Sequence, residues 1–447
     1  MVIGAGEGLG IAFRAQAAGL KVALFDKGRL GGTCLNVGCI PSKILIHAAD
    51  VIASIREASK LGIHATIKRI DFGAIMQRMR ENVERGRGFI EGAIQDSEGL
   101  DFYNAEGRFI ADYTMQIGGE TISAKRIFIV SGSRPVVPFV KGLGDIDYLN
   151  NENVLALTKR PESIIIIGGG YIAVEYGHFF AAMGSRVTII QHNRRLVPNE
   201  EPEVSDLLMN ELGKRIDVVA NADIVEVSRA GNINYVRFRN RDNGVEKEVG
   251  AERIMIAAGR MSNADLLDVW KTGVETNASR YIKVDDYLMT TKENIWAYGD
   301  AIGRQMFTHA GDKETEIAWH NANNSDKLKM DFGIVPHAVY TYPQIASIGL
   351  AEEQARKEFN VMVGRANYSD VAKGKAMMEE KGFAKAVVDK DTKRILGFHI
   401  IGPEASILIQ EVVNAVANGM TVDSITGSMH IFPALSEIIT ETLNNLE

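Results

Sequence analysis

The chain contains little cysteine, little tryptophan and no excess of basic residues. Its 447 residues include two Cys and three Trp, and its formal net charge is −7. Two cysteines cannot form the disulfide framework of a small secreted scaffold, and they supply only two of the four ligands of a structural zinc site. The nearest histidine is His47 and no second Cys or His cluster lies nearby, so we predict no metal site. An acidic chain without a basic tail argues against a nucleic-acid partner.

Long apolar runs and a secretory signal are also missing. No apolar run reaches the ~20 residues that a membrane span needs. The first residues, MVIGAGEGLG, lack a charged region followed by an apolar region. We therefore expect a cytoplasmic protein with no membrane partner. A hydrophobic fraction of 46% with 24% charged residues is typical of globular chains, and the length predicts about three domains.

Two segments, residues 1–27 and 163–192, share one glycine-rich pattern. Each consists of an apolar strand, a Gly-rich turn, an amphipathic helix and a second strand. This is the pattern of a dinucleotide-binding βαβ unit, in which glycines let the backbone approach a pyrophosphate at the positive end of the helix. The glycines predicted to bind cofactor are Gly4, Gly6 and Gly8 in the first turn and Gly168 and Gly170 in the second.

The first unit has the expected acidic residue after its second strand, but its turn is irregular. Its second strand ends at Asp26, whose carboxylate can accept hydrogen bonds from ribose hydroxyls. Leu9 occupies the position of the third glycine, and only three residues precede the turn. The first strand is therefore predicted to be unusually short, unless the natural chain begins earlier.

The pattern changes from about residue 334 onward. VVDKDTKRILGFHIIG (387–402) alternates as a hairpin does, and EASILIQEVVNAVANGM (404–420) follows as a helix. Strands followed by a long helix predict a separate α+β domain at the end of the chain.

Both cysteines lie in one short segment, GGTCLNVGCIPSK (31–43). Four residues separate them, which allows a turn that brings the sulfurs together, and Pro41 suits the first turn of a following helix. Structural disulfides are rare in reducing compartments, so redox chemistry is the favoured interpretation.

This segment resembles the redox-active disulfide motif of the pyridine nucleotide-disulfide oxidoreductases, the family of dihydrolipoamide dehydrogenase, glutathione reductase and mercuric reductase. The resemblance extends along the chain through SGSRP (131–135), AAGRMSN (257–263), AYGDA (297–301), YTYPQIASIGL (340–350) and PALSE (433–437). It implies an α/β fold with two Rossmann-like dinucleotide-binding domains, for FAD and NAD(P), and a C-terminal α+β dimerisation domain. The expected domains are 1–147 and 263–330 for FAD, 148–262 for NAD(P) and 331–447 for dimerisation.

The resemblance also implies roles for individual residues. Cys39 would face the flavin as the charge-transfer thiolate, and Cys34 would exchange with the substrate. Lys43 would lie near the flavin N5 and pair with Glu175, and Tyr171 would cover the flavin until nicotinamide displaces it. The remaining FAD and NAD(P) contacts implied by these motifs are Gly32, Thr33, Gly132, Gly259 and Asp300.

The choice of nicotinamide cofactor depends on the end of the second strand in the second unit. NAD-specific members of the family carry an acidic residue there, whereas this chain has Gln191, followed by His192, Arg194 and Arg195. These cations could bind a 2′-phosphate. NADPH is therefore slightly favoured, and NADH remains an alternative.

The C-terminal motif departs from the family pattern. Disulfide-reducing members place a His before the proline as general acid and base, oriented by a Glu four residues later. Here Pro433 and Glu437 match, but the preceding residue is Phe432. His430 lies two positions earlier, and positions two apart in an extended chain are about 7 Å apart. It therefore cannot simply occupy the missing place, and whether it substitutes for the base stays open.

These observations predict a homodimeric FAD-dependent NAD(P)H disulfide oxidoreductase, similar to dihydrolipoamide dehydrogenase. Its active sites would be shared between subunits, and its acceptor would be a small-molecule disulfide, a dithiol or another oxidant. Because Phe432 replaces the base, a mercuric-reductase-like enzyme and an enzyme similar to 2-ketopropyl-coenzyme M oxidoreductase/carboxylase are alternatives. A non-catalytic scaffold is the least favoured.

Overall fold

The structure, a computed structural model, describes residues 1–447. The chain forms two compact units, each assembled from three segments. Unit 1 consists of Met1–Ser42, Met76–Val136 and Gly259–Phe332, and unit 2 consists of Lys43–Ile75, Val137–Ala258 and Gly333–Glu447. The predicted domain boundaries near residues 147, 262 and 330 stay predictions.

Unit 1 is built on a five-stranded parallel sheet in the order β17-β7-β1-β2-β3. Its strands are β1 (Val2–Ile3), β2 (Val22–Phe25), β3 (Leu100–Tyr103), β7 (Ile127–Ile129) and β17 (Ile295–Ala297). The inner strands are apolar and buried, as expected for a parallel sheet covered on both faces. In this chain β1 comprises two residues. Helices α1 (Gly8–Ala17) and α7 (Thr308–Asn323) pack against each other beside this sheet.

Two small antiparallel elements complete the strands of unit 1. One is the sheet of β4 (Gly107–Ala111), β5 (Thr114–Ile117) and β6 (Glu120–Ser123), and the other pairs β8 (Ser133–Pro135) with β16 (Arg260–Ser262).

The cysteine segment folds as two helices, not as a simple turn. Helix α2 (Gly32–Val37) contains Cys34, and α3 (Cys39–Glu57) begins at Cys39. Gly38 separates them with φ −131° and ψ −113°, a conformation outside the helical region. The expectation that Pro41 lies in the first turn of a helix is confirmed. Helix α4 (Phe72–Gln95) follows.

The helical stretch Gly32–Leu61 is long and apolar enough, by length and composition alone, to cross a membrane. Its mean hydropathy is 1.3, and 39% of the apolar window is buried inside the protein. Core helices meet the same criterion, and charged residues such as Lys43 and Asp50 interrupt the run and form ion pairs within unit 2. We draw no membrane assignment from it.

Unit 2 contains a second parallel sheet in the order β11-β10-β9-β15. Its strands are β9 (Ser163–Ile167), β10 (Arg186–Ile190), β11 (Asp217–Val219) and β15 (Arg253–Ile256), accompanied by helices α5 (Tyr171–Met183) and α6 (Pro202–Leu212). An antiparallel sheet of β12 (Ala222–Ala230), β13 (Ile233–Asn240) and β14 (Glu246–Ala251) adjoins it.

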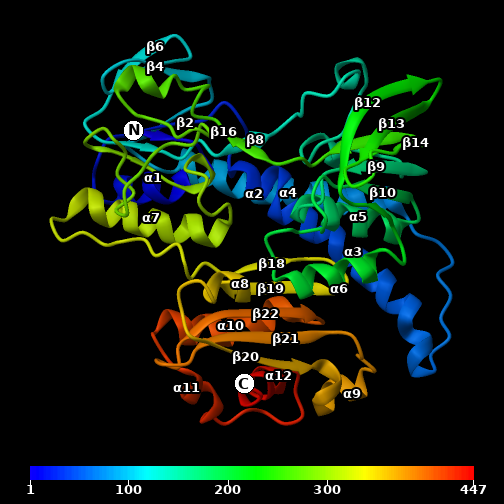
Figure 1. Cartoon of the computed structure of the whole chain (residues 1–447). Helices are drawn as coiled ribbons and strands as arrows, with labels where there is room; N and C mark the ends of the chain where they lie inside the picture. Colours follow the sequence, from blue (N-terminus) through cyan, green and yellow to red (C-terminus); the bar gives the residue numbers. More distant parts are fainter. The chain divides into compact units, whose positions relative to one another are not determined.

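The C-terminal part of unit 2 is a five-stranded antiparallel sheet in the order β18-β19-β22-β21-β20 (Figure 1). The strands are β18 (His337–Val339), β19 (Gln344–Gly349), β20 (Val361–Asn367), β21 (Phe383–Asp389) and β22 (Ile395–Gly402). Five helices accompany them: α8 (Glu352–Ala355), α9 (Ala372–Ala376), α10 (Ala405–Ala417), α11 (Val422–Thr426) and α12 (Glu437–Asn444). The predicted hairpin is β21–β22, and the predicted helix is α10, so both expectations are confirmed.

One row of polar residues crosses this otherwise apolar sheet. The strand register aligns His337, Ser347, His399, Lys385 and Arg365 from β18 to β20. Neighbours in register point to the same face of a sheet. This basic row binds the acidic segment at the start of α6, because Glu200 contacts His337 and Ser347 while Glu203 contacts Lys385 and Arg365.

Candidate active site

The first glycine-rich turn forms a close-packed backbone cradle at the N-terminus of α1. Gly4 has φ +108°, and a Cβ there would lie 2.2 Å from the Val130 carbonyl oxygen. A Cβ on Gly32 would lie 2.6 Å from the Gly6 Cα, so these two chain segments touch through their backbones. Gly8 packs the helix against Val2, where a Cβ would lie 2.9 Å from the side chain. Free N–H groups at such a turn suit a pyrophosphate.

Asp26 lies beyond the carboxyl end of β2, as predicted. Its carboxylate accepts hydrogen bonds from the backbone N–H groups of Ala5 and Gly28, each at 2.7 Å. A cavity of about 550 Å³ opens beside it. Its lining includes Gly28, Phe102 and Asn104, which follow or end β2 and β3, together with residues of α4. The volume falls in the range of small-molecule sites.

Asp300 follows β17 at the same edge of the sheet. Ser133 Oγ donates to Asp300 Oδ2 at 2.6 Å, and Arg260 Nε donates to Ser133 Oγ at 2.7 Å. Gly132 and Gly259 adopt φ values of +66° and +120°, which glycine tolerates best.

The residues at this edge fit an FAD. Ser131 Oγ is buried without a hydrogen-bond partner, and the Gly4 and Gly32 positions leave no room for a side chain. A buried hydroxyl with no partner and a tight Gly cradle are what a phosphate-bearing ligand would complete. Thr33, in the first turn of α2, follows Gly32 directly.

Glu7, at the N-cap of α1, is a feature of the site that the sequence did not reveal. Burial, followed by the proximity and hydrogen bond of Asp312, raises the pKa of its carboxyl group to about 8. Cys39 and Asp300 add smaller effects in the same direction. At neutral pH, Glu7 is therefore protonated and adds no negative charge to the cradle.

The two cysteines approach each other at the α2–α3 junction as free thiols. A hydrogen bond with Cys39 and burial raise the pKa of the Cys34 thiol. Cys39 Sγ lies 3.5 Å from Thr308 Oγ1, at the first residue of α7. Cys39 is the more exposed of the two.

Lys43 and Glu175 form the pair that the family motif implied. Lys43 Nζ lies 3.0 and 2.9 Å from the two carboxylate oxygens of Glu175. Glu175 also accepts the Tyr340 backbone N–H at 3.0 Å, and the Lys43 ammonium lies 4.6 Å from the centroid of the Tyr340 ring. The cation is thus held by one carboxylate and one aromatic face. Their roles toward the flavin stay predictions.

The second glycine-rich turn opens α5 at Tyr171. Gly168 has φ +116°, and a Cβ there would lie 2.2 Å from the Ala257 carbonyl oxygen. Gly170 is the N-cap of the helix. The Tyr171 hydroxyl donates to Glu200 Oε1 at 2.9 Å, so the proposed aromatic lid has a hydrogen-bond partner.

Glu200 is a buried carboxylate at the centre of a small network. His337 Nε2 lies 2.7 Å from Glu200 Oε1, and Ser347 Oγ donates to Oε2 at 2.8 Å. Burial alone would raise the pKa of Glu200, but the bonds from His337, Ser347 and Tyr171 outweigh it, so the pKa is lowered. Glu200 is therefore ionised at neutral pH.

The segment after β10 carries the predicted nicotinamide-specificity residues. Gln191 is buried against the second turn, since a Cβ on Gly169 would lie 2.8 Å from its side chain. Acidic partners engage the three basic side chains that follow, in the pairs His192–Asp223, Arg194–Asp242 and Arg195–Asp206. A 2′-phosphate would have to compete with Asp242 or Asp206 for these arginines.

The C-terminal departure is a surface feature. The Phe432 side chain is 73% exposed, and Met429 and Ile431 beside it are exposed as well. His430 is held within its own domain, because Nε2 lies 2.7 Å from Glu411 Oε1. Glu437 accepts the Ala434 backbone N–H at 3.1 Å at the start of α12.

Family models match nearly the whole chain. The model described as pyridine nucleotide-disulphide oxidoreductase covers residues 1–322, and its dimerisation domain covers residues 335–443. The chain belongs to the pyridine nucleotide-disulphide oxidoreductase family. It is therefore an enzyme of the flavoprotein disulfide reductase group, with the mixed α/β fold and the dimerisation domain that the sequence predicted. The family implies a flavin and a nicotinamide cofactor.

Individual relatives differ in substrate. The chain is 33% identical to mycothione reductase of Mycobacterium tuberculosis, over all of this chain and 98% of the relative. It is 32% identical to dihydrolipoyl dehydrogenase of Chlamydia muridarum, over 99% of this chain and 95% of the relative. It is 31% identical to mercuric reductase of Bacillus cereus, over 98% of this chain and 69% of the relative.

Among solved structures, the HOCl-induced flavoprotein disulfide reductase RclA of Escherichia coli is similar throughout. The TM-score is 0.87 at 27% identity, covering 99% of this chain and 98% of RclA. A Cu(II) complex of RclA matches with a TM-score of 0.88.

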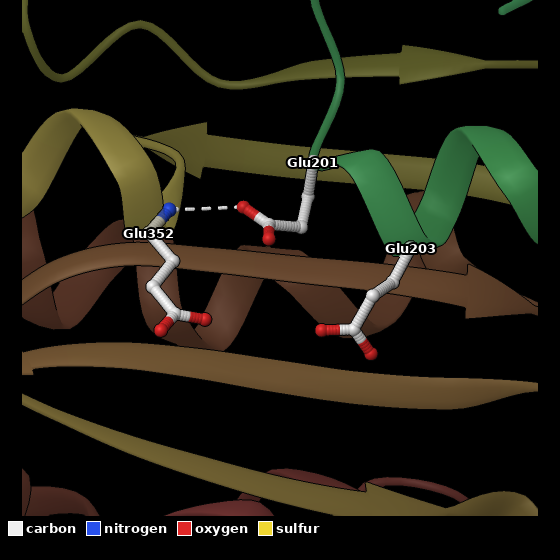
Figure 2. Close-up of side chains that lie close together, drawn as sticks. All are labelled: Glu201, Glu203 and Glu352. Carbon is white, nitrogen blue, oxygen red and sulfur yellow. Dashed lines mark hydrogen bonds between the residues drawn. The ribbon is translucent and has the colours of Figure 1, made fainter.

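A group of three carboxylates in unit 2 tests the prediction of no metal site. Oxygens of Glu201, Glu203 and Glu352 converge in Figure 2, within 4.8 Å of one another. Lys385 Nζ, however, lies 2.8, 2.6 and 2.7 Å from an oxygen of Glu201, Glu203 and Glu352. A protein ammonium group therefore occupies the place where a cation would bind.

Glu200, His337 and Lys385 belong to none of the sequence motifs, and their contacts emerge only in the fold. The available signals were the acidic segment NEEPE (199–203) and the basic residues inside the apolar strands FAKAVVD and ILGFHIIG. A charged residue in a buried strand predicts a partner, but only the fold identifies which carboxylate that partner is.

Proposed function

We propose that this enzyme reduces a small-molecule disulfide with electrons from NAD(P)H, through FAD and the Cys34–Cys39 pair. The observation that carries the proposal is the pair of thiols at the α2–α3 junction, hydrogen-bonded to each other. When bound, FAD supplies two-electron transfer from nicotinamide to the Cys34–Cys39 disulfide. Lys43, held by Glu175, is proposed to place a positive charge beside the flavin.

The output half of the reaction is thiol-disulfide exchange. The Cys34 thiolate attacks one sulfur of the substrate disulfide, and the first substrate thiolate leaves and takes a proton. The Cys39 thiolate then attacks Cys34 sulfur, which releases the second substrate thiolate and reforms the Cys34–Cys39 disulfide. Two electrons pass from the dithiol to the substrate, and the two thiols formed carry two protons.

We propose a homodimer in which Phe432 to Glu437 of one subunit complete the output site of the other. Exposure of Met429, Ile431 and Phe432 in a dimerisation domain supports this proposal. The cytoplasmic location and the preference for NADPH stay predictions.

Reduction of a metal ion is a second candidate, favoured by Phe432. A phenyl ring cannot supply the proton that each leaving thiolate needs, whereas a metal ion takes electrons from thiolates without a positioned acid. Mercuric reductase and the Cu(II) complex of RclA are relatives named for such metals.

The deciding experiment is anaerobic reduction of the purified holoenzyme. NADPH or NADH should produce a long-wavelength charge-transfer band that Cys39→Ser abolishes while FAD stays bound. Cys34→Ser should retain the band and lose disulfide turnover. The reverse pattern would exchange the two assignments, and a wild-type enzyme without any band would refute the proposal. Reoxidation of the reduced enzyme by a small disulfide or by Cu(II) then separates the two candidates.

A further inference from the structure

Tyr171, at the start of the helix in the second nucleotide unit, is hydrogen-bonded to the buried carboxylate of Glu200. Tyr171 is the first residue of α5, directly after the Gly168–Gly170 turn. A dinucleotide pyrophosphate binds at such a helix N-terminus, so an entering nicotinamide nucleotide meets this side chain. The Tyr171 hydroxyl donates to Glu200 Oε1 at 2.9 Å.

His337 reinforces that arrangement from the C-terminal sheet. Its imidazole stacks on the Tyr171 ring, with centroids 5.7 Å apart and planes inclined by 27°. Its Nε2 lies 2.7 Å from the same oxygen that accepts the Tyr171 hydroxyl. The ring and the hydroxyl of Tyr171 are therefore held by two residues that contact each other.

Glu200 itself has little freedom to follow a moving tyrosine. Its carboxylate is fully buried, and Ser347 occupies its second oxygen at 2.8 Å. The next residue, Glu201, is bound by the Lys385 ammonium at 2.8 Å. It also accepts the Glu352 backbone N–H at 2.9 Å (Figure 2). The carboxylate is thus anchored on both sides, and displacement of Tyr171 must break its hydrogen bond to Glu200.

We propose that Glu200 and His337 are positioning residues that hold Tyr171 against displacement and thereby weaken nicotinamide-nucleotide binding. This inference rests on the proposed function, because it takes Tyr171 as the side chain that must move aside before nicotinamide reaches the flavin. Because displacing Tyr171 costs free energy, the enzyme binds a nicotinamide nucleotide more weakly than the contacts to that nucleotide alone would allow. The oxidised nucleotide then dissociates sooner.

The test is equilibrium titration of the oxidised holoenzyme with NADP⁺ and with NAD⁺, followed by stopped-flow reduction with NADPH and NADH. Tyr171→Phe keeps the ring and its packing but removes the hydroxyl, and Glu200 keeps its His337 and Ser347 bonds. We expect the Kd to fall by about tenfold, the size of a hydrogen bond to a charged group. Stopped-flow reduction of the wild-type flavin reports separately whether nicotinamide delivers electrons to it.

Glu200→Gln tests the acceptor. Its effect should be of the same direction, and the double variant Tyr171→Phe/Glu200→Gln should bind no more tightly than the stronger single variant, since both remove one interaction. Tyr176→Phe is the matched control, because Tyr176 lies in the same helix α5 and its buried hydroxyl has no hydrogen-bond partner. Its Kd should stay within about twofold of wild type.

An unchanged or higher Kd in Tyr171→Phe would overturn the inference, even if Glu200→Gln fails to fold. So would an additive double variant. The proposed function would still hold after either result if NADPH or NADH reduces the flavin of the wild-type enzyme. A wild-type flavin that neither nucleotide reduces would refute both.

Discussion

Lys385 has 3% of its side chain exposed, and three carboxylates surround its ammonium group. Burial alone would lower its pKa, yet the bonds from Glu201, Glu203 and Glu352 together raise it. Removing one member of a buried ionic cluster leaves the others without compensation. The carboxylates would then repel one another inside the protein.

We predict that Lys385→Met lowers the free energy of unfolding by about 3–5 kcal/mol. Lys381→Met is the matched control, because Lys381 is 51% exposed and pairs with Glu211 at 2.8 Å. Its effect should be below about 1 kcal/mol. Urea denaturation followed by circular dichroism measures both. Equal losses in the two variants would contradict a special role for the buried cluster.

At the residue scale, the sequence predicts a contact between two side chains when both belong to known motifs. It does not predict contacts between residues outside such motifs, which only the fold brings together. The Lys43–Glu175 contact followed from two family motifs 132 positions apart. Glu200 belongs to none of the family motifs, and its partners Tyr171, His337 and Ser347 come from distant segments. Nothing in local composition indicates that these four side chains meet.

At the element scale, helix α1 carries an ionisable group where its N-terminus should receive a pyrophosphate. Burial and Asp312 raise the pKa of Glu7 to about 8, from an ordinary value of 4.5. Because the pKa of Glu7 is higher in the folded than in the unfolded protein, the protonated carboxyl group favours folding. This contribution to the free energy of unfolding is complete below the unfolded pKa of about 4.5 and is lost as the pH rises toward 8. Above pH 8, Glu7 adds a negative charge to the cradle.

We predict that FAD dissociates more readily as the pH rises from 7 to 9. Loss of one proton limits the change in Kd to about tenfold per pH unit. Fluorescence of FAD released into the filtrate measures it. Glu7→Gln cannot ionise, so its FAD affinity should be nearly flat over this range. A Glu7→Gln protein with the wild-type slope would assign the effect to another group.

The segment after β10 gives a second prediction at this scale, on nicotinamide preference. Arg194 Nη1 donates to Asp242 Oδ2 at 3.3 Å, within a bidentate contact. Asp242→Asn should release Arg194 for a 2′-phosphate and lower KM for NADPH by about threefold to tenfold. KM for NADH should stay unchanged, and adding Arg194→Ala should remove the gain. A fall in both KM values would show that charge alone, not 2′-phosphate recognition, is responsible.

Local patterns were sufficient to predict both glycine-rich turns, the β21–β22 hairpin and helix α10, because their periodicity is set by burial of one face or both. The α2–α3 junction was not predicted, since a C-x4-C spacing is compatible with a turn or with two helices. The junction leaves no room for a side chain at position 38, because a Cβ on Gly38 would lie 2.9 Å from the Thr33 carbonyl oxygen.

At the scale of the whole molecule, the output half of the reaction depends on residues that two subunits are proposed to share. Phe432→His should raise disulfide turnover by up to about 10²-fold, with Glu437 available to orient the imidazole. Flavin reduction by nicotinamide should not change. Steady-state turnover with lipoamide or another small disulfide, beside stopped-flow reduction, measures the two halves.

Met429→His is the control, since it places an imidazole on the same exposed segment at a different position. It should leave turnover near the wild-type value. Rapid wild-type turnover that His430→Ala abolishes would identify His430 as the base, although His430 is bound by Glu411. Rapid turnover insensitive to both changes would mean that solvent supplies the proton.

The polar row across the C-terminal sheet has a consequence for protein engineering. Basic residues of β18, β21 and β20 contact carboxylates at the start of α6, far away in sequence: His337 contacts Glu200, and Lys385 and Arg365 contact Glu203. A chimera that replaces only the C-terminal domain with a relative's would leave Glu200, Glu201 and Glu203 facing a foreign surface. The exchangeable module of this enzyme is therefore the C-terminal domain together with residues 199–203, and recombination points placed between them should yield unstable hybrids.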